Sequence, residues 1–593
     1  MSHETGAFQV GQSLHETLRR LDGQLFGRCR QALCGQAFAL GLDGQSLQFV
    51  HVQGSTGADP ASVLRLTLLP AALNLDARRH LATAVRRRAV FDFLLRAYSA
   101  AVRRYCRPNR GEEGSGRFQP PELPQQVLER NVWTLQPDGR LSFLVRISLP
   151  GRRPASLIAS QAAEMLAEEL PAVLASIAAA AGSGSALAEH IAAVEDAEAI
   201  AGQLADRGLV AFIPDGARLP RRSGDVDLPA DPRQVVPFRS PTSLRVQFEL
   251  PDGRIISGMG IRQGVTAIIG GGFHGKSTVL AALTRGVYPH IPGDGRERVV
   301  TDRSAVLLRA EDGRSVHDVD IAAFIRNLPD GRDTSRFSTS NASGSTSQAA
   351  ALVEALWAGT RLVLLDEDTS ATNFLVRDER MQKLVPDDPI TPFVEHARNL
   401  FDRHGISTIV VCGSSSRFLD VADCVIQMHK WVPLDRTDDA ARLRDTWQAD
   451  SLPAVPESDP RVLEPDNFRP DFHDAKRGSV VPERIKPLRG AWRVLEYGDD
   501  KLDLTALPSL VDPDQVLCIG RLLCLARKQD WATGRSPTAL AEILHRKVDA
   551  TGYADLQTDR YLYLARPRRL DIAAAINRLR RLAIQRRDIP PTS

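Results

Sequence analysis

The chain has 593 residues, of which 43% are hydrophobic and 25% are charged, and its formal net charge is +3. This length is too great for one hydrophobic core and predicts roughly three to five domains, while the ordinary composition indicates a folded globular protein without a particular partner. Seven scattered cysteines without a CxxC pair argue against a disulfide framework and a structural zinc site, so we expect a reducing, cytoplasmic compartment.

The first part of the chain predicts a domain of mixed helix and strand. Residues 14–110 combine both patterns, and residues 127–149 contain two strand-like runs around a Pro-Asp-Gly turn, which favours a hairpin. Residues 160–182 and 186–207 have helical patterns, and Pro171 is expected to break or restart the first of them.

Two stretches bear on membranes. Residues 1–12 lack a basic head followed by an apolar run, so no signal peptide is expected. The most apolar helical stretch, residues 172–181, starts after Pro171 and stops at a Gly-Ser-Gly-Ser run, which makes it too short to span a bilayer. The sequence therefore predicts no membrane-spanning segment.

The remainder of the chain divides into an α/β region and a carboxyl-terminal region. Residues 214–242 predict irregular structure, and residues 243–430 alternate short apolar runs with helical patterns. Residues 433–485 are rich in Asp, Pro and Arg and predict a linker or extended arm, whereas residues 500–590 recover helical periodicity.

The strongest pattern is a glycine-rich loop. Residues 270–277 read Gly-Gly-Gly-Phe-His-Gly-Lys-Ser and match GxxxxGK[ST] in full, between a strand-like run at 265–269 and a helix start at 278–283. In such a loop the backbone N–H groups surround the phosphates of ATP, the lysine reaches the β- and γ-phosphates, and the serine hydroxyl binds Mg²⁺. The predicted nucleotide-binding residues are Gly270, Gly271, Gly272, Phe273, His274, Gly275, Lys276, Ser277 and Thr278, and Lys276 is also assigned a catalytic role.

A second pattern is an apolar run that ends in two acids, 90 residues after Lys276. Residues 362–365 are followed by Asp366 and Glu367, as in a buried parallel strand that ends at a ligand-binding edge. We expect Asp366 to hold Mg²⁺ through a water molecule and Glu367 to orient and deprotonate the attacking water.

A third segment lies between these two motifs. Residues 341–348 read Asn-Ala-Ser-Gly-Ser-Thr-Ser-Gln and precede a predicted amphipathic helix at 349–357. This order resembles the signature segment of ABC-class ATPases, centred on Ser343, Gly344 and Ser345, where a hydroxyl and backbone amides at a helix N-terminus suit a γ-phosphate. The Asp-Thr-Ser-Ala-Thr-Asn run that begins at residue 368 resembles the D-loop of the same class.

Most of the chain resembles the family of predicted ATPases of the ABC class. The most specific block is Gly-Val-Tyr-Pro-His-Ile-Pro-Gly-Asp-Gly-Arg-Glu at residues 286–297. The resemblance implies a multidomain α/β protein with an α+β amino-terminal domain, a central ABC-type P-loop NTPase domain with a mixed sheet, and a small, mostly helical carboxyl-terminal domain. The predicted domains are residues 1–160, residues 161–455 with a sheet core from about residue 240, a linker or arm at residues 456–485, and residues 486–593.

The resemblance also implies how the chain assembles and acts. In ABC enzymes the signature of one subunit closes over the nucleotide held by the other, so one chain with one copy of each motif is expected to form a homodimer with two composite sites. ATP would hold the subunits together and hydrolysis would release them. A eukaryotic relative is associated with mitochondrial RNA processing, so the resemblance suggests RNA as the partner.

Two residues of the usual ABC pattern are missing. After the strand expected at 408–412 the sequence reads Gly-Ser-Ser-Ser, without the usual histidine, which weakens any expectation of fast turnover. No glutamine lies between Thr278 and Ser347, and Glu311 or Asp312 could take that place near the metal, although an exposed turn is the simpler interpretation.

Two arginine clusters suggest a binding surface. Residues 78–110 contain ten arginines and one acid, Asp92, and residues 566–587 contain eight arginines and one acid, Asp571. Such clusters attract phosphate backbones, so we expect a basic channel that binds nucleic acid, with solvated helix faces as the alternative.

Several assignments stay open on sequence alone. The chain could instead serve a membrane partner as its ATPase subunit, act as a P-loop phosphotransferase, or be a nucleotide-dependent scaffold with negligible hydrolysis. Arg296 and Arg314 are candidates for phosphate contacts or structural pairs, with surface ion pairs favoured, and Phe248 and Tyr288 are expected in the core rather than against adenine.

Overall fold

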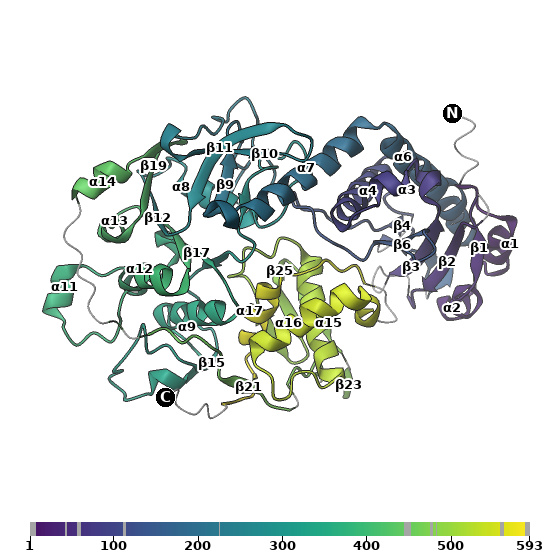
Figure 1. Ribbon diagram of the computed structural model, residues 1–593. Helices are drawn as coiled ribbons and strands as arrows, with labels where there is room; N and C mark the ends of the chain where they lie inside the picture. Colours follow the sequence, from purple (N-terminus) through teal and green to yellow (C-terminus); the bar gives the residue numbers. More distant parts are fainter. Residues whose placement is uncertain are drawn as a thin grey trace. The chain divides into compact units, whose positions relative to one another are not determined.

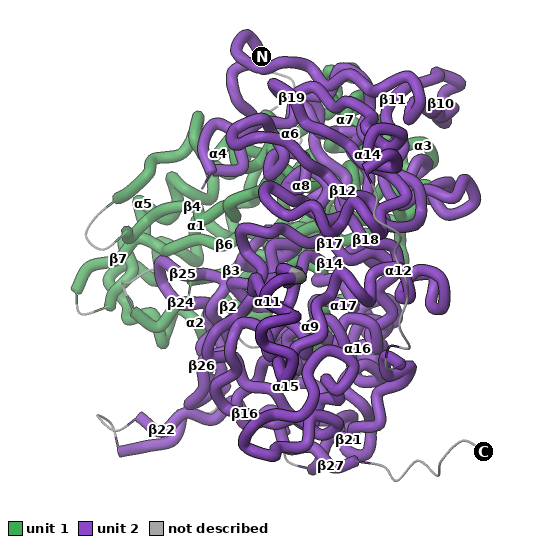
Figure 2. Tube along the Cα trace, turned by 90° about the vertical axis from the view of Figure 1, so that its left-hand side faces the viewer, with its two compact units in different colours: residues 1–195, 552–566 green, residues 196–551, 567–593 purple. Residues whose placement is uncertain are grey.

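The computed structural model describes most of the chain, which forms two compact units. The described residues are 8–41, 44–55, 61–110, 114–153, 155–224, 226–443, 452, 454–465, 467–474, 478–481, 483–557 and 562–586. Unit 1 contains residues 1–195 and 552–566, and unit 2 contains residues 196–551 and 567–593 (Figure 2).

Unit 1 is built on an antiparallel sheet of six strands in the order β1-β2-β3-β6-β4, with β5 also pairing β6. Trp133 lies opposite Phe143 across β5 and β6, and their rings stack at 3.9 Å, which confirms the predicted hairpin. The strands are β1 (Ala37–Ala39), β2 (Ser46–His51), β3 (Ser62–Leu68), β4 (Arg117–Phe118), β5 (Trp133–Leu135) and β6 (Leu141–Ser148). The main helices are α1 (Gln12–Arg20), α2 (Phe26–Leu33), α4 (Ala84–Tyr105), α5 (Ala159–Glu164) and α6 (Leu170–Gly182), and α7 (Ser185–Gln203) continues past residue 195.

Pro171 lies where the helix restarts as α6, which is one of the two outcomes that the sequence predicted. A π-helical turn at Met165–Glu169 joins α5 to α6, and Pro171 occupies the start of α6, where a missing N–H is tolerated. The resulting helix, Ala159–Gly182, has 24 residues and a mean hydropathy of 1.4 in its most apolar window. By length and composition it could cross a membrane, so the expectation of a stretch too short to span is wrong. More than half of that window, 56%, is buried, as in a core helix.

Unit 2 contains a mixed six-stranded sheet in the order β14-β17-β18-β12-β19-β20 (Figure 1). All neighbours are parallel except β19 and β20, which form an antiparallel hairpin. The strands are β12 (Val265–Ile269), β14 (Val306–Leu308), β17 (Leu362–Asp366), β18 (Ser407–Val411), β19 (Cys424–His429) and β20 (Val432–Asp435). A second, antiparallel sheet has the order β10-β11-β9-β13, with β9 (Leu209–Pro214), β10 (Arg245–Glu249), β11 (Ile255–Arg262) and β13 (Val300–Thr301).

Both faces of the six-stranded sheet are covered. Val363 and Leu365 of β17 pack into the apolar cluster that contains α9 and α12, whereas Leu362 and Leu364 pack into the cluster that contains α8. This alternation explains why the strand is a continuous apolar run. The helices of this region are α8 (Lys276–Arg285), α9 (Gly344–Trp357), α10 (Thr372–Leu375), α11 (Glu379–Leu384), α12 (Phe393–His404), α13 (Arg417–Val421) and α14 (Thr437–Leu443).

The carboxyl-terminal region adds helices and a small sheet to unit 2. Its helices are α15 (Pro513–Lys528), α16 (Pro537–Thr551) and α17 (Arg569–Asn577), and its sheet joins β24 (Ile485–Leu488), β25 (Ala491–Tyr497) and β26 (Asp500–Asp503). Short strands also occur in the predicted linker: β21 (Arg461–Leu463), which pairs β27 (Ile584–Arg586), and β22 (Phe472–Asp474), which pairs β23 (Ser479–Val481). Between α16 and α17 the chain passes through unit 1 at residues 552–566.

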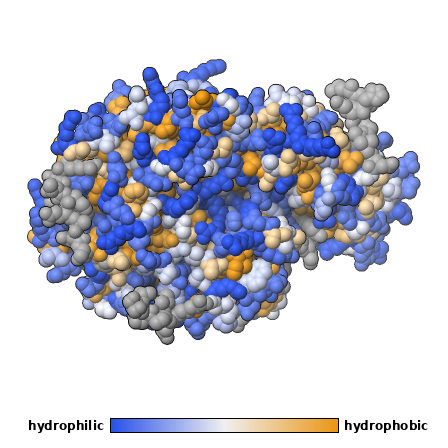
Figure 3. All heavy atoms as spheres, in the orientation of Figure 1, coloured by the Kyte–Doolittle hydropathy of each residue, from blue (hydrophilic) through white to orange (hydrophobic). Residues whose placement is uncertain are grey.

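On the face drawn in Figure 3, hydrophobic residues occur in small groups among hydrophilic ones, as on most protein surfaces. Among the described large hydrophobic side chains, the most exposed is that of Phe273, at 98%, in the glycine-rich loop of unit 2.

Candidate nucleotide-binding site

The glycine-rich loop joins the end of β12 to the start of α8, as predicted. Gly270 has φ +140°, and a Cβ atom there would lie 2.4 Å from the carbonyl oxygen of Met428. Gly275 has φ +101°, and its Cβ would lie 2.9 Å from the Trp431 ring. Since a side chain at either position would collide with its neighbour, these two glycines give the loop its shape.

The loop presents unused hydrogen-bond donors. Among the described residues, no backbone N–H group from Gly271 to Thr278 donates to another residue of the chain. The Nζ of Lys276 lies over the loop and donates to the carbonyl oxygens of Gly270, at 2.7 Å, and Gly271, at 2.9 Å. Free N–H groups at a helix N-terminus beside an ammonium group suit a chain of phosphates, so the residues present fit a nucleoside triphosphate.

Asp366 ends β17 at the same edge of the sheet. Burial raises the pKa of its carboxyl group above the ordinary value, while Arg309 and Lys276 oppose that rise. Its oxygen accepts a hydrogen bond from the N–H of Asp368 at 3.4 Å. A buried carboxylate near a lysine can take part in holding a divalent cation, because a cation would favour its charged form.

Glu367 is bound by the segment that lacks the expected histidine. Its carboxylate accepts from the N–H groups of Gly413, at 2.5 Å, and Ser414, at 3.0 Å, and from the Ser414 hydroxyl. Burial alone would raise the pKa of Glu367, but the Ser414 hydroxyl, these N–H groups and Lys276 outweigh it and lower the pKa. A Cβ atom at Gly413 would lie 3.7 Å from Glu367 and 4.0 Å from Lys276 Nζ, so these groups are gathered at one place.

The signature segment is the first turn of α9 and not a loop before it. The helix starts at Gly344, five residues earlier than expected, because the Ser343 side chain caps it by accepting from the Thr346 N–H at 3.4 Å. A Cβ atom at Gly344 would lie 3.2 Å from Ala310, so this turn is closely packed. In the described part of the chain, the hydrogen bonds of Ser343, Gly344 and Ser345 do not reach the glycine-rich loop.

Gln348, one turn along α9, ties this helix to the D-loop-like segment. Its side chain donates to the Ser370 hydroxyl at 2.9 Å and accepts from the Ala371 N–H at 2.9 Å. The structure therefore brings Lys276, Asp366 and Glu367 together on one side, and joins the signature turn to the segment after Glu367 on the other.

The remaining candidates have structural roles. The Glu311 side chain pairs with Arg578 rather than facing the glycine-rich loop. Arg314 forms a buried pair with Glu354, and Arg296 is buried and donates to the Leu219 carbonyl oxygen. Both arginines thus have the structural role that the sequence favoured. They are buried, however, whereas ion pairs on the surface were expected. The core assignment of the two aromatic residues is confirmed, since Phe248 packs on Phe212 and the Tyr288 hydroxyl accepts from Gln515 at 3.0 Å.

Sequence reasoning missed an aromatic residue beside the loop. Trp431 lies in the turn between β19 and β20, its N–H donates to the His274 carbonyl oxygen at 3.0 Å, and its side chain is 44% exposed. Lys430 and Trp431 both have positive φ, +48° and +65°, in a left-handed backbone that non-glycine residues seldom adopt. No local signal marks Trp431, because 155 residues separate it from Lys276 and only the parallel pairing of β12 with β19 brings them together.

Many arginines of the two clusters are already paired within their own unit. In the first cluster the Arg96 guanidinium contacts Asp92 at 2.7 Å and lowers the pKa of that buried carboxyl to about 2 against the effect of burial. Others pair as follows: Arg86 with Glu195, Arg110 with Glu169, Arg566 with Glu129, Arg568 with Asp571, Arg569 with Glu542 and Arg578 with Glu311. Exposed members remain at Arg78, Arg79, Arg103, Arg104, Arg580 and Arg581.

Comparison with known proteins matches this architecture along most of the chain. A model of an ABC-class ATPase P-loop domain matches residues 183–458, and a model described as "ATPase of the ABC class N-terminal" matches residues 11–180. A third, described as "MRB1590 C-terminal domain", matches residues 489–585.

A curated relative is similar over a shorter stretch. It is the uncharacterized protein MJ1628 of Methanocaldococcus jannaschii, which is 35% identical over 182 residues. The match covers 29% of this chain and 40% of that relative. With its P-loop, its mixed sheet and these matched domains, the chain belongs to the family of ATPases of the ABC class.

Proposed function

We propose that the protein binds Mg-ATP at the glycine-rich loop and hydrolyses it at two composite sites of a homodimer. One observation carries the proposal: the unused N–H groups of Gly271–Thr278 lie beside Lys276, with Asp366 and Glu367 at the same sheet edge. Ser277 and Asp366 would hold Mg²⁺, which supplies charge neutralisation for the phosphates when bound.

Lys276 and Glu367 both have to change partners for turnover. Lys276 would exchange the carbonyl oxygens of Gly270 and Gly271 for phosphate oxygens, which are stronger acceptors for an ammonium group. Glu367 would have to leave Gly413 and Ser414 before it could orient and deprotonate a water molecule. We therefore propose a slow basal rate, limited by the release of Glu367.

The signature turn would act on the nucleotide of a second copy. Ser343, Gly344 and Ser345 begin a helix of 14 residues, whose N-terminal dipole and free amides suit the γ-phosphate. The exposed Phe273 ring lies in the P-loop, where a second subunit would cover it on closure. Two sites related by a twofold axis follow from one such contact.

Nucleotide-dependent association tests this assembly. Sedimentation velocity should show a monomer without nucleotide or with ADP and a dimer with Mg-ATP, since only the γ-phosphate would join the two subunits. Identical profiles in all three conditions would contradict the composite site.

A nucleotide-dependent scaffold is the second candidate function. The contacts of Ser414 with Glu367 favour it, because a carboxylate with a lowered pKa is a weaker base than one with an ordinary pKa. In that case the dimer would form with Mg-ATP and persist, with almost no phosphate release.

We further propose that the dimer acts on nucleic acid, with RNA favoured, through the exposed arginines. About four phosphate contacts would give a slope near −3 in a plot of log affinity against log salt for a single strand, or about a 50-fold loss between about 50 and 200 mM. Fluorescence anisotropy of a labelled unstructured oligonucleotide measures this slope.

A paired substitution makes the measurement specific. Arg103→Gln with Arg104→Gln, at the end of α4, should reduce the slope by about 1.4. Arg19→Gln with Arg20→Gln, at the end of α1 outside the clusters, is the matched control and should leave it unchanged. A salt-independent affinity, or the same reduction from both pairs, would contradict the nucleic-acid proposal.

Trp431 gives an internal probe of the nucleotide base. Its half-exposed ring next to Gly275 is placed to stack on a base, so Mg-ATP should change its fluorescence. Trp431→Ala should weaken ATP affinity about 10-fold, as expected for the loss of one stacking contact of about 1–3 kcal/mol, whereas Trp431→Phe should retain most of it. Equal affinities for all three proteins would show that the base binds elsewhere.

A further inference from the structure

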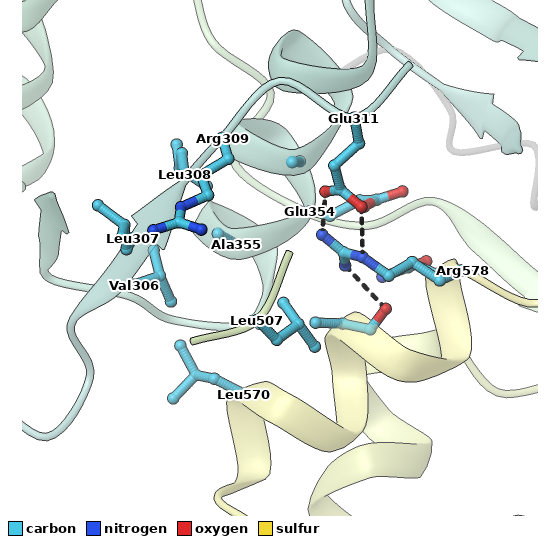
Figure 4. Close-up of a pocket in the computed structure, with 14 residues that line it drawn as sticks. Val306, Leu307, Leu308, Arg309, Glu311, Glu354, Ala355, Leu507, Leu570 and Arg578 are labelled. Atoms are coloured by element: carbon cyan, nitrogen blue, oxygen red, sulfur yellow. Dashed lines mark hydrogen bonds and ion pairs between the residues drawn. The ribbon is translucent and has the colours of Figure 1, made fainter. Parts of the chain in front are cut away.

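The end of α17 is joined to the segment that follows β14. The Arg578 Nε donates to Glu311 Oε2 at 2.9 Å, and a second contact joins the Nη2 of the same guanidinium to Oε1. Both side chains are largely buried, at 6% and 13% exposure. Figure 4 shows the two groups facing each other across the edge of a cavity. A buried bidentate pair of this kind fixes orientation as well as distance.

The backbone of Glu311 is hydrogen-bonded to the signature turn, so it links the Arg578 pair to that turn. Its N–H donates to the Ser347 hydroxyl at 2.9 Å, and that hydroxyl donates to the Gly344 carbonyl oxygen at 2.9 Å. On the far side of Glu311, the Gly313 N–H donates to the Ala342 carbonyl oxygen at 2.8 Å. The signature turn is therefore held against residues 310–314 by hydrogen bonds.

The same segment also contacts the turn after Glu367. The Ala310 N–H donates to the Thr369 carbonyl oxygen at 3.0 Å. At Gly344 a Cβ atom would lie 3.2 Å from the Ala310 Cβ and 3.4 Å from the Ala371 Cβ, so the three residues are closely packed. A displacement of residues 310–314 would consequently move the signature turn.

A cavity lies beside the pair at this junction. Its volume is about 40 Å³, enough for a few water molecules, and it is lined by apolar side chains of β14, α9 and α17 together with Arg309, Glu354 and Asn577. Helix α17 also packs on α9, and other polar contacts from the same end of the chain include that of Arg580, which donates to the Gly313 carbonyl oxygen at 3.3 Å, and that of His317, which meets the Leu579 carbonyl oxygen at 2.9 Å. Burial would raise the pKa of Glu311, but Arg578 and Arg314 outweigh it and keep the carboxyl ionised.

We propose that Arg578 is a positioning residue for the ATPase signature: the carboxyl-terminal helix α17 holds Glu311, and Glu311 holds the turn of Ser343–Ser347 in the geometry that a partner's nucleotide requires. Any event that shifts α17 then changes the signature without touching the glycine-rich loop of the same chain. The effect on a partner's nucleotide rests on the proposed composite site. The first part of the proposal, that Arg578 holds the signature turn through Glu311, concerns the single chain.

Hydrogen exchange on the whole protein tests whether Arg578 holds the signature turn, and this measurement does not depend on ATP hydrolysis. Arg578→Gln should speed exchange at least tenfold in peptides that span residues 342–350, with no change in peptides that span residues 270–280. Arg578→Lys, which keeps the charge but loses the bidentate geometry, should have an intermediate effect. Arg581→Gln is the matched control, since its exposed side chain contacts Asp500 outside the junction. Unchanged exchange at residues 342–350 in the Arg578→Gln protein would overturn the proposal.

Mixed dimers test which nucleotide site is affected. A trace of Arg578→Gln subunits in a large excess of Lys276→Ala subunits forms mixed dimers, each with one site that has an intact glycine-rich loop and an intact signature. Per trace subunit, this mixture should hydrolyse ATP at the rate of a trace of wild type in the same excess of Lys276→Ala. A trace of wild type in a large excess of subunits with both substitutions should be at least tenfold slower, because its mixed dimers pair the intact loop with the altered signature. The reverse pattern would mean that Arg578 supports its own chain's loop and would overturn the proposal. Loss of activity in the wild-type and Lys276→Ala mixture would instead mean that the two sites of one dimer depend on each other, and the exchange result would then decide the role of Arg578.

Discussion

Replacing Glu367 by glutamine is expected to slow ATP hydrolysis at least about 100-fold while leaving the ATP-driven dimer intact. Glutamine has nearly the same shape and can still orient a water molecule, but it cannot take up a proton, and a general base contributes about 10²–10⁴ in rate. Steady-state phosphate release measures the loss, and sedimentation with Mg-ATP shows whether the dimer persists.

Ser414→Ala is the matched control for this substitution. It removes the hydroxyl that holds Glu367 but leaves the carboxylate in place, so turnover should be equal or faster. The Ser414 hydroxyl helps to lower the pKa of Glu367, so its removal raises that pKa and the loss of activity on acidification should begin at a higher pH than in the wild type. A Glu367→Gln protein with the wild-type rate would remove Glu367 from the mechanism.

Replacing Lys276 by alanine should weaken ATP binding by at least about 30-fold, equivalent to about 2 kcal/mol. The side chain lies over the loop at 2.7 Å from the Gly270 carbonyl oxygen, where its ammonium group can meet incoming phosphates. Calorimetric titration with a slowly hydrolysed ATP analogue gives the affinity directly.

Lys430→Ala provides the comparison for the lysine. Lys430 is an exposed cation beside the same loop, and its N–H contacts the His274 ring at 3.2 Å. The Lys430→Ala substitution should change the affinity for the ATP analogue less than about threefold, because a solvent-exposed charge is weakly coupled to its surroundings. Equal losses for the two lysines would mean that general positive charge, and not the position of Lys276, binds the nucleotide.

The parts of the fold that the sequence predicted are those set by short stretches of chain. Three features are each determined by fewer than about 25 consecutive residues, flanking elements included. They are the glycine-rich loop, the apolar run of β17, and the hairpin at Trp133 and Phe143. Local pattern failed at the start of α9, since the cap at Ser343 extended that helix toward its N-terminus. The pattern placed a restart at Pro171 correctly but gave no sign of the π-helical turn before it.

The contacts that distinguish this site join residues far apart in the sequence. Ser414 lies 47 residues from Glu367, and Arg578 lies 267 residues from Glu311. Trp431 reaches Gly275 only because β19 pairs with β12. A serine, an arginine and a tryptophan at such positions carry no periodic or motif signal, so the contact of Ser414 with Glu367 and the pairing of Arg578 with Glu311 became visible only in three dimensions.

The central claim is that two copies of the chain share each ATP, and the rate of ATP hydrolysis per subunit against protein concentration tests it most directly. The composite site predicts that this rate rises with concentration and reaches a plateau where sedimentation shows the dimer to be complete. A rate per subunit that is constant from nanomolar to micromolar protein would contradict it, because a single chain would then hydrolyse ATP alone.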